Sequence, residues 1–367
     1  MTHRERVLTT LDHREPDRVP RSMGLAGSAH DQFRAITGSK NPREYWDMDF
    51  TAVGFRAPEV DWHKRFDAYY DASDKPYQFK HNEYPPEWGI AQKMAGFHHF
   101  SRPLFPLRNA VSVAEIEGYP FPDYIKEWEH DHLEGEVERL RAEGYPVGGS
   151  IQRIFQTAWY LRSREQLFVD FLESPAIAEA ILERIGDIVM DMARRLSAAG
   201  VDILLMADDI GMQDRMMMSP DTWRKWIKPH AARAFATARQ IKPDIHIAYH
   251  TDGDFEAVIP DLVEIGVTIL STVQPESMDV FAIKERWGRD VTLMGTVGVQ
   301  STFRFGTPGE VKEMIREQVE VLGKGGGFVL SPANAVEPDV PWENIVAFFE
   351  AANEYGWYAP DRDGQRR

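Results

Sequence analysis

The regular alternation of short β-rich runs with helical segments is the feature that most constrains this fold. Several runs are almost entirely apolar, as is typical of parallel strands buried on both faces. Repetition of strand, loop and helix predicts a parallel α/β sheet. Eight runs predict closure into a single (β/α)8 TIM barrel, with a doubly wound open sheet as the alternative. The runs lie at residues 19–23, 51–55, 147–151, 202–206, 245–249, 267–271, 291–295 and 327–330.

Helix boundaries are marked between these runs. Ser174 and Pro175 predict a helix start, because serine offers a capping oxygen and proline fits the first turn. Thr307 and Glu310 have the spacing of a capping box, in which the glutamate reaches back to the cap. These signals support the expected alternation of strands and helices.

One long stretch interrupts the alternation, at residues 56–140 between the second and third runs. It is rich in Trp, Tyr, His and Pro, and we interpret it as a lid inserted after the second strand. The barrel domain is predicted over residues 1–360. The polar residues 361–367 are predicted to be a frayed tail.

The composition excludes several classes of function. The 367 residues include no cysteine, which excludes disulfides, cysteine zinc sites and thiolate catalysis. Lys plus Arg number 42 against 58 Asp plus Glu, and the net charge of -16 disfavours nucleic acid and anionic membranes as partners. No run approaches the roughly 20 apolar residues of a membrane span, and the start lacks the apolar core of a signal peptide. We therefore expect a cytoplasmic protein that acts on a small molecule.

Polar residues that follow the predicted strands are the candidates for chemistry, because a barrel carries its active site at the carboxyl ends of its strands. Asp208 and Asp209 follow the fourth run, where paired acids suit metal binding or proton transfer, although either could cap a helix. His250 and Asp252 follow the fifth run and predict a metal half-site or an acid/base pair. Both can face inward only if the strand breaks near Gly253.

The remaining runs contribute weaker candidates. Asn334, after the eighth run, can donate and accept hydrogen bonds and would suit a heterocycle, with turn formation as the alternative. Arg153, after the third run, could bind a carboxylate. The other predicted substrate- or cofactor-binding residues are Gln274, Gln300, Glu337 and Met23.

Several motifs in this order resemble the uroporphyrinogen decarboxylase superfamily over about residues 3–356. They are the stretches 4–8, 13–20, 259–267, 306–311 and 338–345. The resemblance implies a (β/α)8 barrel that is often a homodimer. The superfamily contains the haem-pathway decarboxylase and a set of corrinoid-linked methyltransferases.

Departures from the family pattern indicate which branch this chain resembles. The true decarboxylase holds its substrate carboxylates with two arginines after the first strand, and the matching stretch here, residues 23–28 from Met23 to Ser28, has neither. Losing such cationic partners costs roughly 2 to 5 kcal/mol per buried pair. The family's histidine after the last strand corresponds to Asn334, whereas its acid persists as Asp252. We therefore expect that the porphyrinogen is not the substrate.

The zinc-ligand positions of the family's thiol-alkylating methyltransferases can also be compared with this sequence. They bind zinc through His-x-Cys and a later Cys, and the matching positions here are His250, Asp252 and Asn334. The resemblance thus implies a harder site at His250 and Asp252, suited to water-rich zinc, Mn or Mg, or to no metal. Asp and Asn would also suit a pterin such as tetrahydrofolate.

Three functions follow, in order of preference. The first is methyl transfer or demethylation with a corrinoid protein or tetrahydrofolate, in which the cofactor supplies the difficult chemistry. The second is a decarboxylase or other lyase acting on a small carboxylated substrate. The third is a non-catalytic binding module. The first two require that His250, Asp252 and Asn334 converge on one pocket, whereas divergent side chains would favour the third.

Overall fold

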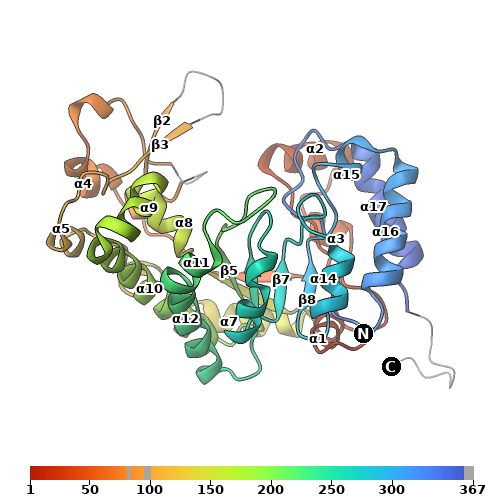
Figure 1. Cartoon of the computed structure of the whole chain (residues 1–367). Helices are drawn as coiled ribbons and strands as arrows, with labels where there is room; N and C mark the ends of the chain where they lie inside the picture. Colours follow the sequence, from red (N-terminus) through yellow and green to blue (C-terminus); the bar gives the residue numbers. More distant parts are fainter. Residues whose placement is uncertain (81–83, 95–100, 359–367) are drawn as a thin grey trace.

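Seven of the eight predicted runs form one curled parallel sheet in a computed structural model that describes residues 1–80, 84–94 and 101–358 (Figure 1). Each strand pairs with the next one along the sheet in parallel register. The fold class is therefore α/β with a parallel sheet, as predicted. In sheet order the strands are β1 (Thr51–Val53), β4 (Val147–Ile151), β5 (Ile203–Ala207), β6 (His246–His250), β7 (Ile269–Ser271), β8 (Thr292–Met294) and β9 (Phe328–Val329).

The first predicted run, residues 19–23, does not form a regular strand. Arg21 makes an isolated parallel bridge to Leu330, just beyond β9, and the Leu330 N–H donates to Pro20 O at 2.9 Å. On its other side, the Asp49 N–H donates to Arg21 O at 3.0 Å. Since Pro20 has no amide hydrogen, the ladder is interrupted there. This run thus lies between β9 and the approach to β1, and within it only Arg21 forms a bridge to the β9 side.

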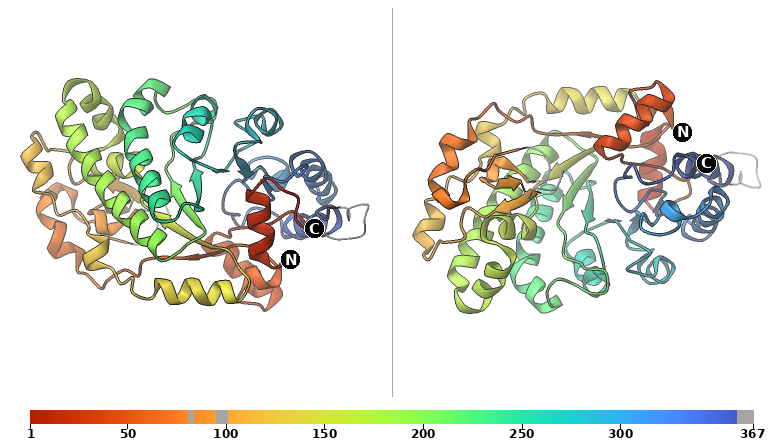
Figure 2. Two further views of the ribbon diagram at one scale, coloured as in Figure 1. Left: turned by 90° about the horizontal axis from the view of Figure 1, so that it is seen from below. Right: turned by 90° about the horizontal axis from the view of Figure 1, so that it is seen from above.

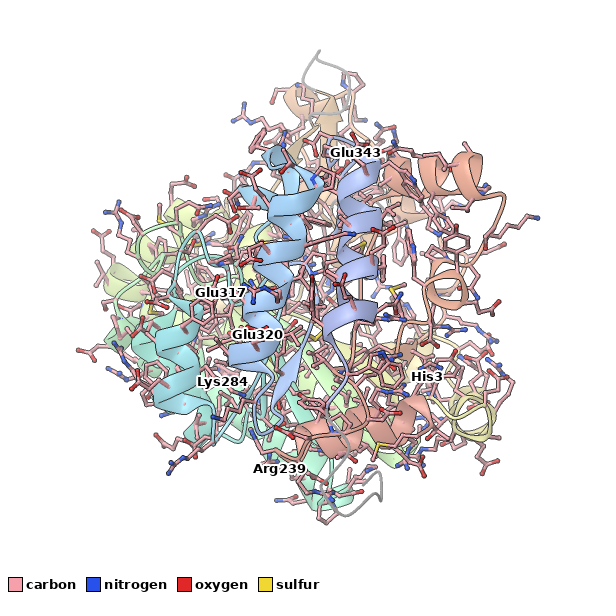
Figure 3. All side chains as sticks on the ribbon, turned by 90° about the vertical axis from the view of Figure 1, so that its right-hand side faces the viewer. His3, Arg239, Lys284, Glu317, Glu320 and Glu343 are labelled. Carbon is pink, nitrogen blue, oxygen red and sulfur yellow. The ribbon has the colours of Figure 1, made fainter. Side chains whose placement is uncertain are left out.

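The helices surround the outside of the sheet (Figure 2), and α16 and α17 lie side by side (Figure 3). No helix in the described ranges combines the length and apolar character needed to cross a membrane. The longer helices are α7 (Leu133–Ala142), α8 (Phe155–Arg162), α9 (Arg164–Glu173), α10 (Pro175–Ala198), α11 (Pro220–Trp226), α12 (Lys228–Ile241), α14 (Val280–Trp287), α16 (Pro308–Leu322) and α17 (Trp342–Tyr355). Helix α2 (Gly27–Thr37) is of comparable length, and α3 (Pro42–Tyr45), α13 (Ile259–Glu264) and α15 (Thr302–Phe305) are short.

The predicted helix starts are confirmed, with one difference in capping. The capping box of Thr307 and Glu310 is present at the start of α16. Helix α10 does begin at Pro175, but the Ser174 side chain makes no capping hydrogen bond. The prediction of a serine cap was therefore wrong, because Ser174 has ψ 54° rather than the extended backbone typical of an N-cap.

The stretch predicted as an insertion contains short helices and an antiparallel hairpin. Its elements include α4 (Trp62–Phe66), β2 (Ala91–Met94), β3 (Ser101–Leu104), α5 (Val113–Glu117) and α6 (Tyr124–Glu127). Helices α5 and α6 pack against α10, and the hairpin projects beyond α8 and α9 (Figure 1). Buried aromatic side chains from Trp62, Phe66, Trp88 and Tyr119 belong to the main hydrophobic core. The domain limits and the lid role stay predictions, and the tail 361–367 lies outside the described residues.

Helix α1 (His3–Leu11) closes one end of the sheet. Its Val7 and Leu11 form a buried cluster with Ile203, Ala248 and Ile269 from β5, β6 and β7. Two of these contacts lie at or near the amino ends of their strands, which leaves the carboxyl ends for a functional site. Burial of these apolar side chains contributes roughly 1.5 to 3 kcal/mol each.

A buried carboxylate, Asp49, anchors α1 and the first run beside β1. Its oxygens accept hydrogen bonds from the side chains of Arg6 and Arg18, each at 2.7 Å, and from His3 Nδ1 at 2.9 Å. The Arg21 N–H donates to it at 2.8 Å. Burial alone would raise the pKa of Asp49, but the His3 hydrogen bond and the Arg18 guanidinium outweigh it, so the pKa lies below its usual range.

Replacing this carboxylate should destabilise the whole fold. Asp49→Asn would leave the buried Arg6 and Arg18 without their shared charge, and we expect a loss of about 3 kcal/mol in the free energy of unfolding. Urea denaturation measures it. Asp31→Asn, which removes only an exposed partner of Arg34, is the control and should change stability by less than about 0.5 kcal/mol.

The difference in free energy of unfolding between wild type and Asp49→Asn should depend on pH. Since the folded pKa of Asp49 is lowered, its stabilisation is complete above the unfolded value of about 3.9 and is lost as the pH falls through the folded pKa. The difference between wild type and Asp49→Asn should be constant near neutrality and shrink below about pH 4. A constant difference down to acid unfolding would contradict the assignment.

Candidate functional site

Three metal-capable side chains meet at the carboxyl ends of β5 and β6. His250 is the last residue of β6, Asp252 lies two residues further on, and Asp209 follows β5. Each offers a ligand atom, and these atoms lie within 4.8 Å of one another. All three residues are partly buried. Three of the predicted strand-end candidates therefore converge here.

The strand β6 ends at His250, and the change in backbone direction at Gly253 brings these residues together. Gly253 has φ +79°, and the Asp254 N–H donates to Met212 O at 2.6 Å, which joins the loops that follow β5 and β6. A Cβ on Gly253 would lie 2.4 Å from Met212 O, and one on Gly211 would lie 2.4 Å from Asp252 O. Only glycine fits either position. The prediction that the strand ends close to Gly253 is confirmed.

One carboxylate oxygen of Asp252 lacks a hydrogen-bond partner within the described residues. Its Oδ2 accepts from Asn334 Nδ2 at 3.0 Å, whereas its buried Oδ1 has no hydrogen-bond partner among the described residues. Oδ1 lies 3.8 Å from His250 Nε2. Burial and the nearby Asp209 charge raise the pKa of Asp252, despite the opposing effects of His250 and Asn334. An unpartnered carboxylate oxygen here needs a proton or a cation.

Asp209 occupies the third ligand position, which the sequence comparison had given to Asn334. The Asp252 N–H donates to Asp209 Oδ1 at 3.1 Å. Asn334 Oδ1 accepts from the Ala335 N–H at 2.8 Å, so the asparagine presents its amide nitrogen to Asp252. Asn334 therefore holds Asp252 in place, and the candidate oxygen ligands are those of Asp209 and Asp252.

The neighbouring acid, Asp208, has a different role. It is fully buried, and its two oxygens accept from the N–H groups of Phe155 and Gln156, both at 2.9 Å. These groups begin helix α8, so Asp208 caps that helix, which was the alternative foreseen for one member of the pair. Burial raises the pKa of Asp208 to about 6.

Gln274 supports the loop that carries Asp252. Its side chain is buried, and its Oε1 accepts from the Gly253 N–H at 2.6 Å. Gln300 lies at the rim, where its Oε1 accepts from Gln213 Nε2 at 3.3 Å. Their assignment as substrate- or cofactor-binding residues stays a prediction.

Three further candidates lie outside the cluster. Met23 is 5% exposed and packs in the hydrophobic core. Glu337 is exposed on the loop before α17. Arg153 is half-buried after β4 and forms no ion pair with any residue that the structure describes. Arg153 therefore provides a cationic side chain beyond the end of β4 that has no ion pair within the described part of the chain.

Sequence reasoning missed Thr272, which lies immediately after β7. Its hydroxyl is 2.6 Å from His250 Nδ1. Along the chain it continues an apolar run as a β-branched residue, which is typical of a strand interior. Nothing in that pattern distinguishes it from a core residue.

The donor set suits a hard divalent cation. One imidazole nitrogen and two carboxylates match zinc with water ligands, Mn or Mg, and no thiolate is available. The unpartnered Asp252 Oδ1 is the observation that favours such an ion. These residues therefore fit the metal that the family resemblance implies.

Comparisons with known proteins agree with the resemblance. Residues 99–355 match the family model described as uroporphyrinogen decarboxylase (URO-D). Methylcobamide:CoM methyltransferase MtaA of Methanosarcina barkeri is 27% identical over 210 residues, which are 57% of this chain and 58% of that protein. Uroporphyrinogen decarboxylase of Nostoc punctiforme is 25% identical over 180 residues, 49% of this chain and 48% of that protein. The matches thus span about half the length of these relatives.

A solved structure extends the comparison to the whole fold. The structure of a methyltransferase from Methanosarcina mazei aligns with a TM-score of 0.68 at 18% identity, covering 97% of this chain and 99% of that one. At this identity the alignment shows a shared fold. Nearly the full length of both chains takes part, including residues outside the family match.

The close approach at Gly253 can be tested with a matched pair of glycines. Gly253→Ala should lower the free energy of unfolding by more than about 2 kcal/mol, because the strain of positive φ adds to the contact with Met212. Gly325→Ala has the same strain at φ +77°, with nothing within 4 Å of the added Cβ, and should cost about 1 kcal/mol. Chemical denaturation measures both. Equal losses would show that the loop contact is loose.

Proposed function

This chain belongs to the uroporphyrinogen decarboxylase family, and on that premise we propose that it is an enzyme of methyl transfer or demethylation. A corrinoid protein or tetrahydrofolate would be the other methyl carrier. The convergence of Asp209, His250 and Asp252 at the carboxyl ends of the strands carries the proposal. A relative in this family, the Methanosarcina barkeri protein, is a methylcobamide:CoM methyltransferase.

The barrel prediction belongs to the same proposal. We infer that residues 19–23 occupy the eighth position of a (β/α)8 barrel, between β9 and β1. The bridge from Arg21 to Leu330 and the bond from the Asp49 N–H to Arg21 O support this closure. The homodimer and the cytoplasmic location implied at the start stay predictions.

His250 Nε2, with oxygens of Asp209 and Asp252, would hold a divalent cation. When bound, such an ion supplies Lewis-acid polarisation of an oxygen or nitrogen of the methyl donor. Asn334 orients Asp252 through Oδ2 and leaves Oδ1 directed at the site. The protein's own contribution is therefore a fixed set of hard ligands.

Asp252 can also act as a proton donor. Burial and the Asp209 charge raise its pKa, which favours the protonated acid relative to an exposed aspartate. When a methyl group leaves a heteroatom, that atom keeps the bonding electron pair and needs a proton. Asp252 without a bound cation is placed to donate it, and the methyl acceptor supplies the new bond.

A lyase is the second candidate, and Arg153 is the observation that favours it. A half-buried guanidinium without an ion pair to any described residue could bind a substrate carboxylate. Asp252 would then supply the proton that replaces carbon dioxide. The absence of arginines from residues 23–28 argues against the porphyrinogen itself. A non-catalytic module is less favoured, because the candidate side chains converge.

Metal binding is the first test. We expect the protein, stripped with chelator and titrated with Zn²⁺ or Mn²⁺, to bind about one ion, because the three ligands form one site. His250→Ala should weaken binding at least 100-fold. His246→Ala, at the amino end of the same strand, is the control and should bind as wild type does. Equal binding by wild type and His250→Ala would remove the metal from the proposal.

Methyl transfer is the second test. Purified protein, a panel of O-, N- and S-methyl donors and either cob(I)alamin or tetrahydrofolate should yield methylcobalamin or methyltetrahydrofolate. Asp252→Asn should lower the rate at least 100-fold, because it removes both a ligand and a proton donor. Asp214→Asn, an exposed acid on the loop after β5, is the control.

The two candidate functions are distinguished by their products. Release of carbon dioxide from carboxylated substrates, with no transfer from any donor, would favour the lyase. That result should depend on Arg153, and Arg153→Gln would raise the KM for the carboxylated substrate at least tenfold. Methyl transfer unaffected by Asp252→Asn would contradict the site.

A further inference from the structure

Thr272 has a backbone conformation that its side chain disfavours. It follows β7 with φ +79°, and it is the only β-branched residue among the non-glycine residues with positive φ in the described ranges. Such a conformation is rare for a β-branched residue and persists only when its surroundings impose it. Strain of this kind concentrates at functional sites.

The neighbouring strand imposes this conformation. Met294 O, at the end of β8, accepts from the Thr272 N–H at 2.9 Å and from the Val273 N–H at 3.2 Å. Gly295, with φ +74°, makes room for the threonine, since a Cβ at that position would lie 2.7 Å from Thr272 Cα. Thr272 is 1% exposed, so its hydroxyl is fixed by the protein alone.

The hydroxyl of Thr272 lies between a backbone carbonyl and the imidazole of His250. Oγ1 lies 2.9 Å from Ala333 O and 2.6 Å from His250 Nδ1. A carbonyl oxygen can only accept, so a hydroxyl hydrogen directed at Ala333 O leaves Oγ1 as the acceptor for an Nδ1–H of the histidine. Ser271 Oγ, at 3.5 Å from the same nitrogen, is too far to compete.

We propose that Thr272 is a positioning residue that holds neutral His250 with its hydrogen on Nδ1 and its lone pair on Nε2. Nε2 is the nitrogen that faces Asp252 Oδ1. The histidine is thereby prepared to bind a cation or accept a proton without first changing tautomer. This inference deepens the proposed function and rests on the role given there to His250.

The same hydroxyl connects His250 with the loop that carries Asn334. Ala333, which accepts its hydrogen, directly precedes Asn334, and Asn334 holds Asp252. One buried hydroxyl thus fixes the position of the imidazole relative to the loop after β9. A small movement of Thr272 would disturb the nitrogen and oxygen ligands together.

The tautomer can be measured directly. In protein labelled with ¹⁵N-histidine, at about pH 8.5 where an imidazole is ordinarily neutral, long-range ¹H–¹⁵N spectra distinguish Nδ1–H from Nε2–H. The signals lost in His250→Gln identify His250. We expect the Nδ1–H form in wild type, and a wild-type Nε2–H form would overturn the proposal without any further variant.

Two substitutions separate the hydroxyl from the shape of the side chain. Thr272→Val keeps the β-branch and removes the hydroxyl, and we expect a mixture of tautomers and Zn²⁺ affinity lowered about 10- to 100-fold. Thr272→Ser restores the hydroxyl and should keep the Nδ1–H form and most of the affinity. Loss of the tautomer in both variants, or in neither, would overturn the proposal.

The tautomer measurement is independent of the reaction. If no methyl transfer is found but His250 carries Nδ1–H only when residue 272 has a hydroxyl, the proposed function fails and the positioning role stands. If transfer is found and Thr272→Val keeps wild-type tautomer and affinity, the positioning role fails alone. Should Thr272→Val not fold, an Nε2–H form in wild type, or loss of the Nδ1–H form in Thr272→Ser, would still overturn the proposal.

Discussion

The backbone contact between the loops after β5 and β6 determines what this site can be. The Asp254 N–H donates to Met212 O, and the approach is so close that Gly211 and Gly253 admit no side chain. This contact brings the carboxylate of Asp209 beside Asp252. Because two carboxylates lie so close together, ionising both of them costs free energy. Protonation of one carboxylate, or a bound cation, lowers this free energy. The chemistry available to the site follows from this geometry.

The segment after β7 supports the β6 side of that contact at two points. The Thr272 hydroxyl lies 2.6 Å from His250 Nδ1 at the end of β6, and Gln274 Oε1 accepts from the Gly253 N–H in the loop that follows. Neither residue needs to touch a substrate for its loss to matter, because a site loosened by even a small distance loses much of its function. Asp49, near α1 and the approach to β1, contributes stability in a separate part of the chain.

Hard ligands distinguish this site from one built on thiolates. The cysteine-free chain offers one imidazole and two carboxylates, which favours oxygen-rich coordination. The family match and the alignment with a methyltransferase structure supply the framework, and the ligand chemistry narrows the reactions that the framework could host. Fold alone does not name a reaction.

The sequence by itself determined the parallel sheet, seven of its strands and the positions of His250 and Asp252, because apolar runs and the residues that end them are local patterns. Tertiary structure decided that Asp209 faces the site while Asp208 caps α8, and that Asn334 donates to Asp252. It alone decided the role of Thr272. Those assignments depend on hydrogen bonds between residues far apart in the chain and on a backbone strain that neighbouring strands impose, and no local pattern encodes either.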